Sequence, residues 1–149
     1  MFIKDDLYQQ IKKCFPIPCV DLVVINDSNE ILMLRRLSEP AKGKWWFPGG
    51  RVYFMESRRD AAMRKLMEEC GLQGEIVKEI GTYDLLLEIE TEISSHAITT
   101  VFHITVDNDK VIIDDQSTEY AWKTPNNWLK ELVPGFPYDI LIQEFKDTI

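Results

Sequence analysis

The sequence lacks any apolar run of membrane-spanning length, and its first ten residues, MFIKDDLYQQ, are charged where a signal peptide would be apolar. Cysteine is scarce, since Cys14, Cys19 and Cys70 are an odd number without metal-type spacing. No internal repeat, low-complexity segment or linker divides the 149 residues. These absences predict one cytoplasmic domain over residues 1–149, with reduced thiols and no membrane partner.

Net positive charge is also absent, because the formal charge of the chain is −8. The basic residues are nevertheless concentrated between Arg35 and Lys65, where nine of the 17 stand against three acids. That segment carries +6, which leaves −14 for the rest of the chain. A basic island on an acidic protein favours a small anionic ligand held locally and disfavours a nucleic-acid partner. Ordinary clustering of surface charge remains the alternative, above all for Arg58 and Arg59.

Residues 49–72, GGRVYFMESRRDAAMRKLMEECGL, predict a glycine turn, a short loop and a helix. Ser57 stands at an N-cap position with Asp60 three residues later, and Gly71 suits the left-handed position after the last turn. The apolar residues of this helix recur at helical spacing and predict a buried stripe: Ala62, Met63, Leu66, Met67 and Cys70.

The polar side of the same helix carries two pairs of opposite charge. Arg64 and Glu68 are four residues apart, as are Lys65 and Glu69, which places all four away from the apolar stripe. Taken alone, this pattern is typical of a solvated helix face with two ion pairs. Its position after a glycine pair and a glutamate-containing loop indicates a metal-assisted phosphate site instead.

The N-terminal part of the chain predicts a helix and a β-hairpin. The amphipathic helix covers residues 1–15 and ends at Pro16, with an inward face of Phe2, Leu7 and Ile11. Two strands, residues 19–25 and 30–36, flank the turn-type residues 26–29.

Three features of the hairpin and the loop after it bear on a site. Asp21 interrupts the first strand and faces either solvent or a polar cleft, because an unpaired buried charge is costly. Arg35 and Arg36 must point to opposite faces of the second strand, so only one can serve a site directly. The aromatic residues 45–47 could stack on a base, but the area they bury favours a place in the core.

Strands and helices are also predicted downstream. Residues 75–89 and 96–106 are rich in Ile, Val, Leu and Thr and predict two longer strands joined by the polar connection 90–95. His103 lies in the middle of the second of these strands and is predicted to be packed or edge-exposed. Two helices close the chain at residues 128–132, capped by Thr124 or Asn126, and at residues 138–146.

One motif identifies a family. Gly50 is followed by Glu56 after six residues, by Arg64 after eight more, and then by a glutamate pair, a glycine and an aliphatic residue: Glu68, Glu69, Gly71 and Leu72. In this order and spacing the chain resembles the Nudix hydrolases, and the resemblance implies an α/β/α sandwich around a mixed β-sheet. One position departs, because Lys65 stands where the family has a glutamate.

The resemblance extends upstream to one branch of that family. Residues 20–52, with the Pro-Ala-Lys-Gly loop leading into Trp-Trp-Phe-Pro-Gly-Gly-Arg, are similar to the GDP-mannose mannosyl hydrolases. That branch tolerates a missing glutamate after the motif arginine, so Lys65 counts less against activity. His96 matches a histidine near the start of the equivalent strand, although a lone histidine more often has a structural role.

A second stretch, residues 114–122, is similar to the branch segment in which a glutamine ligates the metal and the next histidine is the proposed general base. Gln116 is retained, but Ser117 replaces the histidine. A serine hydroxyl alone cannot accept a proton from water near neutral pH, so the mechanism of the branch cannot be transferred whole. Glu119 is the nearest carboxylate that could substitute, or it belongs to the strand formed by Glu-Tyr-Ala-Trp.

The resemblance, together with the chemistry of the side chains, assigns a role to each candidate residue. The predicted catalytic set is Glu56, Arg64, Glu68 and Glu119, with Glu56 and Arg64 as an internal pair that orients the helix. The predicted substrate-binding set is Asp21, Arg36 and Arg51, since guanidinium groups bind phosphate oxygens with two directed bonds. The predicted metal ligands are the carbonyl of Gly49, Glu69 and Gln116. The expected cofactor is Mg²⁺, with Mn²⁺ as the alternative, and Lys65 implies one essential ion in place of several.

These roles predict hydrolysis of a nucleoside diphosphate derivative, with a nucleotide sugar such as GDP-mannose, giving GDP and the sugar, as the first choice. Cleavage of a phosphoanhydride in ADP-ribose or a nucleoside triphosphate is the alternative. A nucleotide-binding module without turnover is a second alternative. The partner is therefore a small-molecule nucleotide, and the resembled branch implies a homodimer.

Overall fold

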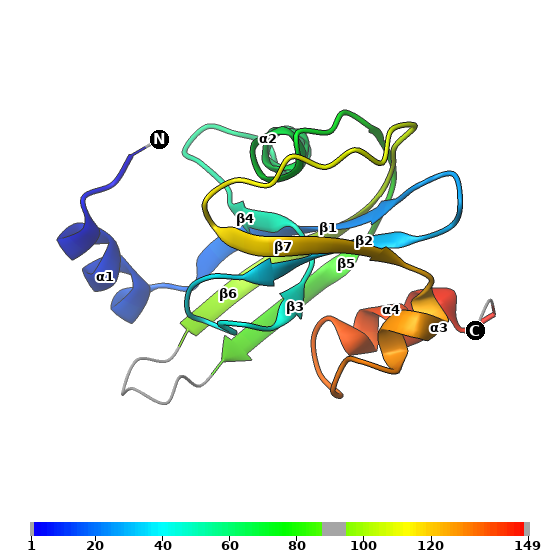
Figure 1. The fold of residues 1–149 in the computed structure, drawn as a ribbon. Coiled ribbons are helices and arrows are strands. Elements are labelled where there is room, and N and C mark those ends of the chain that lie inside the picture. Colours follow the sequence, from blue (N-terminus) through cyan, green and yellow to red (C-terminus); the bar gives the residue numbers. More distant parts are fainter. Residues whose placement is uncertain (1, 88–94, 148–149) are drawn as a thin grey trace.

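The computed structural model describes residues 2–87 and 95–147 (Figure 1). Within these residues seven strands form one sheet of order β3-β2-β1-β6-β5, in which β4 also pairs with β1 and β7 with β2. The pair β1 and β6 is parallel and the other pairs are antiparallel, so the sheet is mixed, as predicted. The elements in chain order are α1 (Asp5–Cys14), β1 (Ile17–Ile25), β2 (Ile31–Arg36), β3 (Trp45–Trp46), β4 (Gly49–Arg51), α2 (Arg58–Cys70), β5 (Glu75–Leu87), β6 (Ser95–Thr105), β7 (Ser117–Lys123), α3 (Pro125–Leu129) and α4 (Tyr138–Phe145).

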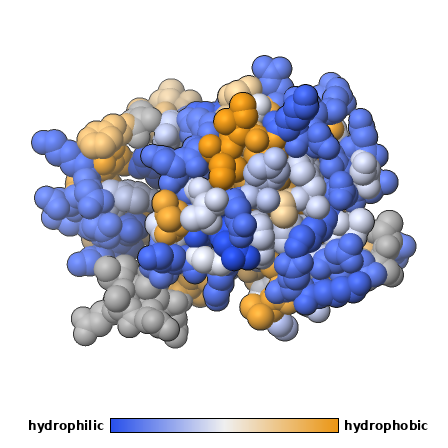
Figure 2. All heavy atoms as spheres, viewed as in Figure 1, coloured by the Kyte–Doolittle hydropathy of each residue, from blue (hydrophilic) through white to orange (hydrophobic). Residues whose placement is uncertain are grey.

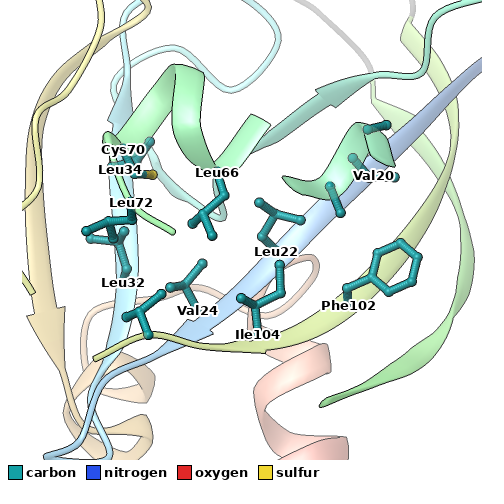
Figure 3. Close-up of a cluster of buried hydrophobic side chains, with 13 residues drawn as sticks. Val20, Leu22, Val24, Leu32, Leu34, Leu66, Cys70, Leu72, Phe102 and Ile104 are labelled. Atoms are coloured by element: carbon teal, nitrogen blue, oxygen red, sulfur yellow. The ribbon is translucent and has the colours of Figure 1, made fainter. Parts of the chain in front are cut away.

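Helices cover both faces of the sheet, with α2 on one side and α3 and α4 on the other (Figure 1). Successive residues of β1 serve two cores, because Leu22 and Val24 pack with Leu66 of α2 whereas Val23 packs with Trp128 of α3. Figure 3 shows the first of these cores, where side chains of β1, β2 and β6 meet those of α2. The predicted α/β/α sandwich is confirmed. The central strands are apolar on both faces because helices cover both faces of the sheet.

The N-terminal elements differ in part from the prediction. The hairpin of β1 and β2 is confirmed, and its turn is closed by Asn26, whose Oδ1 accepts from the backbone N–H groups of Ser28 and Glu30 at 3.0 Å. Helix α1 begins later than predicted and has no buried residue. The prediction that Phe2 and Leu7 point inward is wrong, because these side chains are exposed and α1 stands at one end of the sheet (Figure 1).

Helix α2 has the predicted ends but a different buried face. Ser57 accepts from the N–H of Asp60 and Gly71 adopts a left-handed φ of 64°, so both caps are confirmed. Met67 was predicted in the buried stripe but is exposed. Lys65 and Glu69 were predicted on the outward side, yet both are buried, because the glycine strand β4 lies over them.

The remaining elements follow the prediction except for α3, which was predicted at residues 128–132 and lies at Pro125–Leu129. The segments 75–87 and 95–105 are strands, whereas the predicted end of the first strand and most of the polar connection lie outside the described residues. Thr124, one of the two predicted caps, accepts from the N–H of Asn127 at the start of α3. The indole N–H of Trp128 donates to the carbonyl of Ile31 at 2.8 Å and so attaches this helix to the sheet. Seen from the side of Figure 1, the surface is mainly hydrophilic, with separate hydrophobic patches (Figure 2).

Candidate active site

The glycine pair of β4 brings the backbone directly against α2. Gly49 lies opposite Asp21 in β1, and its N–H donates to Oε2 of Glu69 at 2.8 Å. A Cβ on Gly49 would lie 2.2 Å from the carbonyl oxygen of Val20, and one on Gly50 would lie 2.8 Å from Cε of Lys65. The backbone contact at Gly49 leaves no room for a Cβ, and the φ of 155° at Gly50 is one that L side chains rarely adopt, so glycine is required at both positions.

Arg64 and Glu56 form the predicted internal pair. The Arg64 guanidinium donates to both carboxylate oxygens of Glu56, at 2.7 and 2.9 Å, and to the carbonyl of Arg51 at 2.9 Å. Bidentate geometry of this kind fixes the loop after β4 onto α2. The same arginine lowers the pKa of the Glu56 carboxyl, chiefly through the hydrogen bonds it donates, so Glu56 stays ionised.

Lys65 lies between the two glutamates of the motif. Its Nζ is 3.4 Å from Oε2 of Glu68 and 3.3 Å from Oε1 of Glu69. The side chains of Lys65 and Glu69 are each only 8% exposed, whereas that of Glu68 is 43% exposed. Burial raises the pKa of Glu69, and the Lys65 ammonium opposes that rise. The buried carboxylate therefore depends on Lys65 for its charge balance.

Asp21 points into the protein and not into solvent, which resolves the alternative that the sequence left open. Its carboxyl accepts from Thr99 Oγ1 at 2.5 Å and is almost fully buried. Burial raises the pKa of Asp21 to about 7, and the nearby Glu69 adds to the rise, while hydrogen bonds from Thr99 and Trp46 oppose it.

The pKa of Asp21 predicts a pH dependence of stability. Because its folded pKa, about 7, lies above the ordinary 3.8, the stability it contributes is complete below pH 3.8 and is lost as pH rises through 7. In the metal-free parent, ionisation of Asp21 should lower the free energy of unfolding by up to about 4 kcal/mol between pH 4 and 8. The Asp21→Asn variant cannot ionise at this position, so it should not show this decrease. Urea unfolding at several pH values measures this. Asp27→Asn, in an exposed turn, is the matched control, and an unchanged pH slope in Asp21→Asn would refute the prediction.

A cleft of about 720 Å³ opens between α1, β4, α2 and the loop after β2. Seven of the ten predicted site residues line it: Asp21, Arg36, Gly49, Arg51, Arg64, Glu69 and Gln116. Arg36 is held toward it by a hydrogen bond of 2.6 Å from its Nε to the carbonyl of Pro40. Glu56 and Glu68 do not line the cleft but hold Arg64, which does.

Glu119 is the predicted residue that the structure places elsewhere. It lies opposite Arg35 on neighbouring strands, and Arg35 Nε is 2.8 Å from its Oε1. Arg35 in turn lies over the ring of Trp45, on the face opposite Arg36. Because a pair of adjacent residues on a strand points to opposite faces, Glu119 shares the side of Arg35 and lies away from the cleft. We therefore remove Glu119 from the candidate catalytic set.

Several cleft residues were not predicted from the sequence as site residues. Helix α1 contributes Tyr8, Gln9 and Lys12, and Ser117 lines the cleft beside Gln116. The spacing of Tyr8 and Lys12, four residues apart on one side of a short helix, was the available signal. Trp46 and Phe47 are buried and pack on Phe136 while also reaching the cleft wall, which agrees with the core position favoured for them.

The cleft also contains a thiol and an imidazole. Burial raises the pKa of the Cys19 thiol to about 12, so it stays protonated and is a poor nucleophile. His96 lines the cleft at the start of β6, whereas His103 lies in mid-strand on a different surface, half-buried near Lys78 and Glu144.

The donor groups at the cleft suit a hard cation. Glu69 offers a buried carboxylate, Gly49 a backbone carbonyl and Gln116 a side-chain amide, and oxygen ligands of these kinds fit Mg²⁺ or Mn²⁺. Residues 2–87 and 95–147 contain no cluster of three or more His, Cys, Asp and Glu side chains placed to hold a metal.

Comparisons with known proteins show what the chain is similar to. The model of the NUDIX domain matches residues 16–141. The low-salt glycan biosynthesis protein Agl8 of Haloferax volcanii is 33% identical over 120 residues, covering 78% of this chain and 76% of that protein. The ADP-ribose pyrophosphatase of Methanocaldococcus jannaschii is 28% identical over 142 residues, covering 95% and 80%.

Solved structures share the fold. The crystal structure of the MutT protein from Methanosarcina mazei Go1 superimposes with a TM-score of 0.73 at 26% identity, covering 89% of this chain and 94% of that one. The NUDIX domain of Shewanella oneidensis NrtR, crystallised with ADP ribose, gives a TM-score of 0.71 at 19% identity, covering 97% and 98%. No helix among the described residues is long and apolar enough to span a membrane.

Proposed function

The chain belongs to the Nudix family, and on that premise we propose that it hydrolyses a nucleoside diphosphate derivative in a reaction that depends on one divalent cation. The observation that carries this proposal is the cleft itself, where Arg36 and Arg51 stand with the buried carboxylate of Glu69. Guanidinium groups bind diphosphate oxygens, and a carboxylate beside them holds a cation that bridges to the same oxygens. The arrangement suits a diphosphate that is bound by the two arginines and by a cation held on Glu69.

The positions of the residues support a proposed role for each. Glu69, the Gly49 carbonyl and Gln116 would hold Mg²⁺ or Mn²⁺, and Arg36 and Arg51 would bind the phosphate oxygens. A cation bound there would neutralise negative charge that develops on the leaving diphosphate. Glu56, Arg64 and Glu68 would orient α2 and the loop after β4. Asp21, on the cleft floor, would accept or donate a hydrogen bond to the bound group.

A nucleotide sugar such as GDP-mannose is our first candidate for the substrate. The relative named for glycan biosynthesis supports it, and the resemblance in residues 20–52 points the same way. Attack by water at the anomeric carbon would give GDP and mannose and would need a base other than Glu119 or Ser117. The carboxylate and imidazole groups of the described cleft are Asp21, Glu69, Glu39 and His96. Attack at phosphorus, on ADP-ribose or another nucleotide, is the second candidate, supported by the relative named as an ADP-ribose pyrophosphatase.

Product analysis in ¹⁸O-labelled water tests the proposal. The protein is incubated with Mg²⁺ or Mn²⁺ and with GDP-mannose, other nucleotide sugars, ADP-ribose and nucleoside triphosphates, and the products are separated by HPLC and mass spectrometry. GDP without ¹⁸O, released together with free mannose, supports carbon attack, whereas GMP and mannose 1-phosphate with the label on phosphate support the second candidate. Binding without turnover of any compound would favour a nucleotide-binding module and refute the proposed hydrolysis. A homodimer, implied by the resemblance, and a cytoplasmic location, expected from the sequence, are further proposals.

A further inference from the structure

Two tyrosines and two arginines form a ladder along one wall of the cleft. The guanidinium carbon of Arg51 lies 5.1 Å from the ring centre of Tyr8 and 5.3 Å from that of Tyr53. The guanidinium carbon of Arg64 lies 3.7 Å from the ring of Tyr53. One end of this ladder is fixed, because the Arg64 guanidinium is ion-paired with the carboxylate of Glu56 at 2.7 Å. The other end is Tyr8 on helix α1.

Helix α1 contributes side chains to the cleft but no buried residue to the core. It precedes residues 16–141, which match the family model, and none of its residues is buried. Its half-buried residues Tyr8 and Gln9 nevertheless line the cleft, as does Lys12, whose Nζ lies 5.0 Å from the Tyr8 ring. A helix that adds no core but presents an aromatic ring to a cleft arginine points to a role in ligand binding.

The geometry has a physical consequence for Arg51. A free arginine side chain samples many rotamers, and ordering it on binding costs up to about 2 kcal/mol of entropy. The neighbouring tyrosine rings restrict the Arg51 side chain before a ligand binds. The rings contact the face of the guanidinium group, which leaves its N–H edge to bind phosphate oxygens. The Arg51 backbone is fixed as well, because its carbonyl accepts from Arg64.

We propose that Tyr8 is a positioning residue, which holds the Arg51 guanidinium for a substrate diphosphate through the face of its ring. This inference rests on the proposed function, in which Arg51 binds phosphate oxygens. It extends the substrate site beyond the matched domain to the N-terminal helix. The hydroxyl of Tyr8 has no part in it, so phenylalanine should serve equally well.

A double-mutant cycle tests the inference, with binding of GDP and of ADP in Mg²⁺ measured by calorimetry. Tyr8→Leu should weaken binding of the nucleotide with the higher affinity by roughly three- to tenfold, because one cation–π contact is lost. Tyr8→Phe keeps the ring and should weaken the same binding by less than about twofold. In an Arg51→Ala background, Tyr8→Leu should change affinity by less than about twofold, because its partner is gone. Tyr120→Leu, an exposed tyrosine on β7, is the matched control and should bind like the parent.

Each other outcome overturns the inference. Equal weakening by Tyr8→Leu with and without Arg51 would mean that Tyr8 contacts the ligand itself or only supports the fold. Weakening by Tyr8→Phe as large as that by Tyr8→Leu would assign the effect to the hydroxyl. In both cases the parent still binds diphosphate, so the proposed function survives. A parent that binds neither nucleotide would overturn the function together with the inference.

Discussion

Glu69→Gln is expected to lower turnover by on the order of 10³-fold and to weaken Mg²⁺ binding at least about tenfold, because it removes a buried carboxylate that we propose as a ligand of the cation. Glutamine keeps the volume of the side chain and an oxygen that can accept from the Gly49 N–H, now at 2.8 Å. It loses the negative charge, and its amide would place a donor against the ammonium of Lys65. Glu68 remains as an ion-pair partner of Lys65 at 3.4 Å, so the fold should persist, at reduced stability, while the function is lost.

Steady-state kinetics on the substrate found by product analysis measures the turnover, and Mn²⁺ binding followed by electron paramagnetic resonance measures the metal directly. Glu79→Gln is the matched control, because that glutamate is also ion-paired, with Arg58 at 3.3 Å, but lies on β5 away from the cleft. Its turnover should stay within about twofold of the parent, as surface ion pairs contribute little. A Glu69→Gln protein that binds metal and turns over like the parent would refute the metal assignment.

The fold was predictable where local signals agreed with one another. The caps at Ser57 and Gly71 and the apolar spacing between them fixed α2 almost to the residue. The sheet was predictable from its apolar runs, since strands buried on both faces lack the alternation of half-exposed ones. The two-residue strand β3 and the three-residue strand β4 were not predicted as strands, because so few residues carry no periodicity and pairing with β2 and β1 alone defines them.

The site was predictable where a residue's role depends on spacing and not where it depends on packing. Spacing along the motif placed Glu56, Arg64 and Glu69 together, and strand alternation showed that only one of Arg35 and Arg36 could serve the cleft. The burial of Lys65 follows from β4 lying over α2, which no local pattern reports. The position of Glu119 away from the cleft could not be predicted for a related reason, since nearness to Gln116 in sequence does not fix the face of a strand.

Substitution of Lys65 is expected to have the second large effect, because its ammonium group is the ion-pair partner of the buried Glu69 carboxylate. Its Nζ lies 3.3 Å from Glu69 and 3.4 Å from Glu68, at the place where a family glutamate would add a third negative charge. Removing one partner of a buried pair leaves the other charge without compensation, which typically costs about 3–5 kcal/mol. A divalent cation bound to Glu69 would supply the missing positive charge.

Lys65→Met is therefore expected to lower the free energy of unfolding of the metal-free protein by roughly 3 kcal/mol, because methionine keeps the apolar stem and removes only the charge. Saturating Mg²⁺ should restore most of that loss, so the variant should gain more stability from Mg²⁺ than the parent does. Thermal and urea unfolding, with chelator and with Mg²⁺, measure both effects. The matched control is Lys78→Met, because Lys78 is half-exposed in its ion pair with Glu144 and should cost less than about 1 kcal/mol.

Lys65→Glu separates charge balance from simple packing at the same position. It restores the family's glutamate beside Glu68 and Glu69, so it should be less stable than Lys65→Met without metal and should bind at least one more divalent ion than the parent. Equilibrium dialysis with Mn²⁺ counts the ions, and we expect one per chain in the parent. A parent that already holds several tightly bound ions would contradict this account of Lys65. So would a Lys65→Met protein that is as stable as the parent in chelator, because the buried carboxylate would then not depend on the lysine.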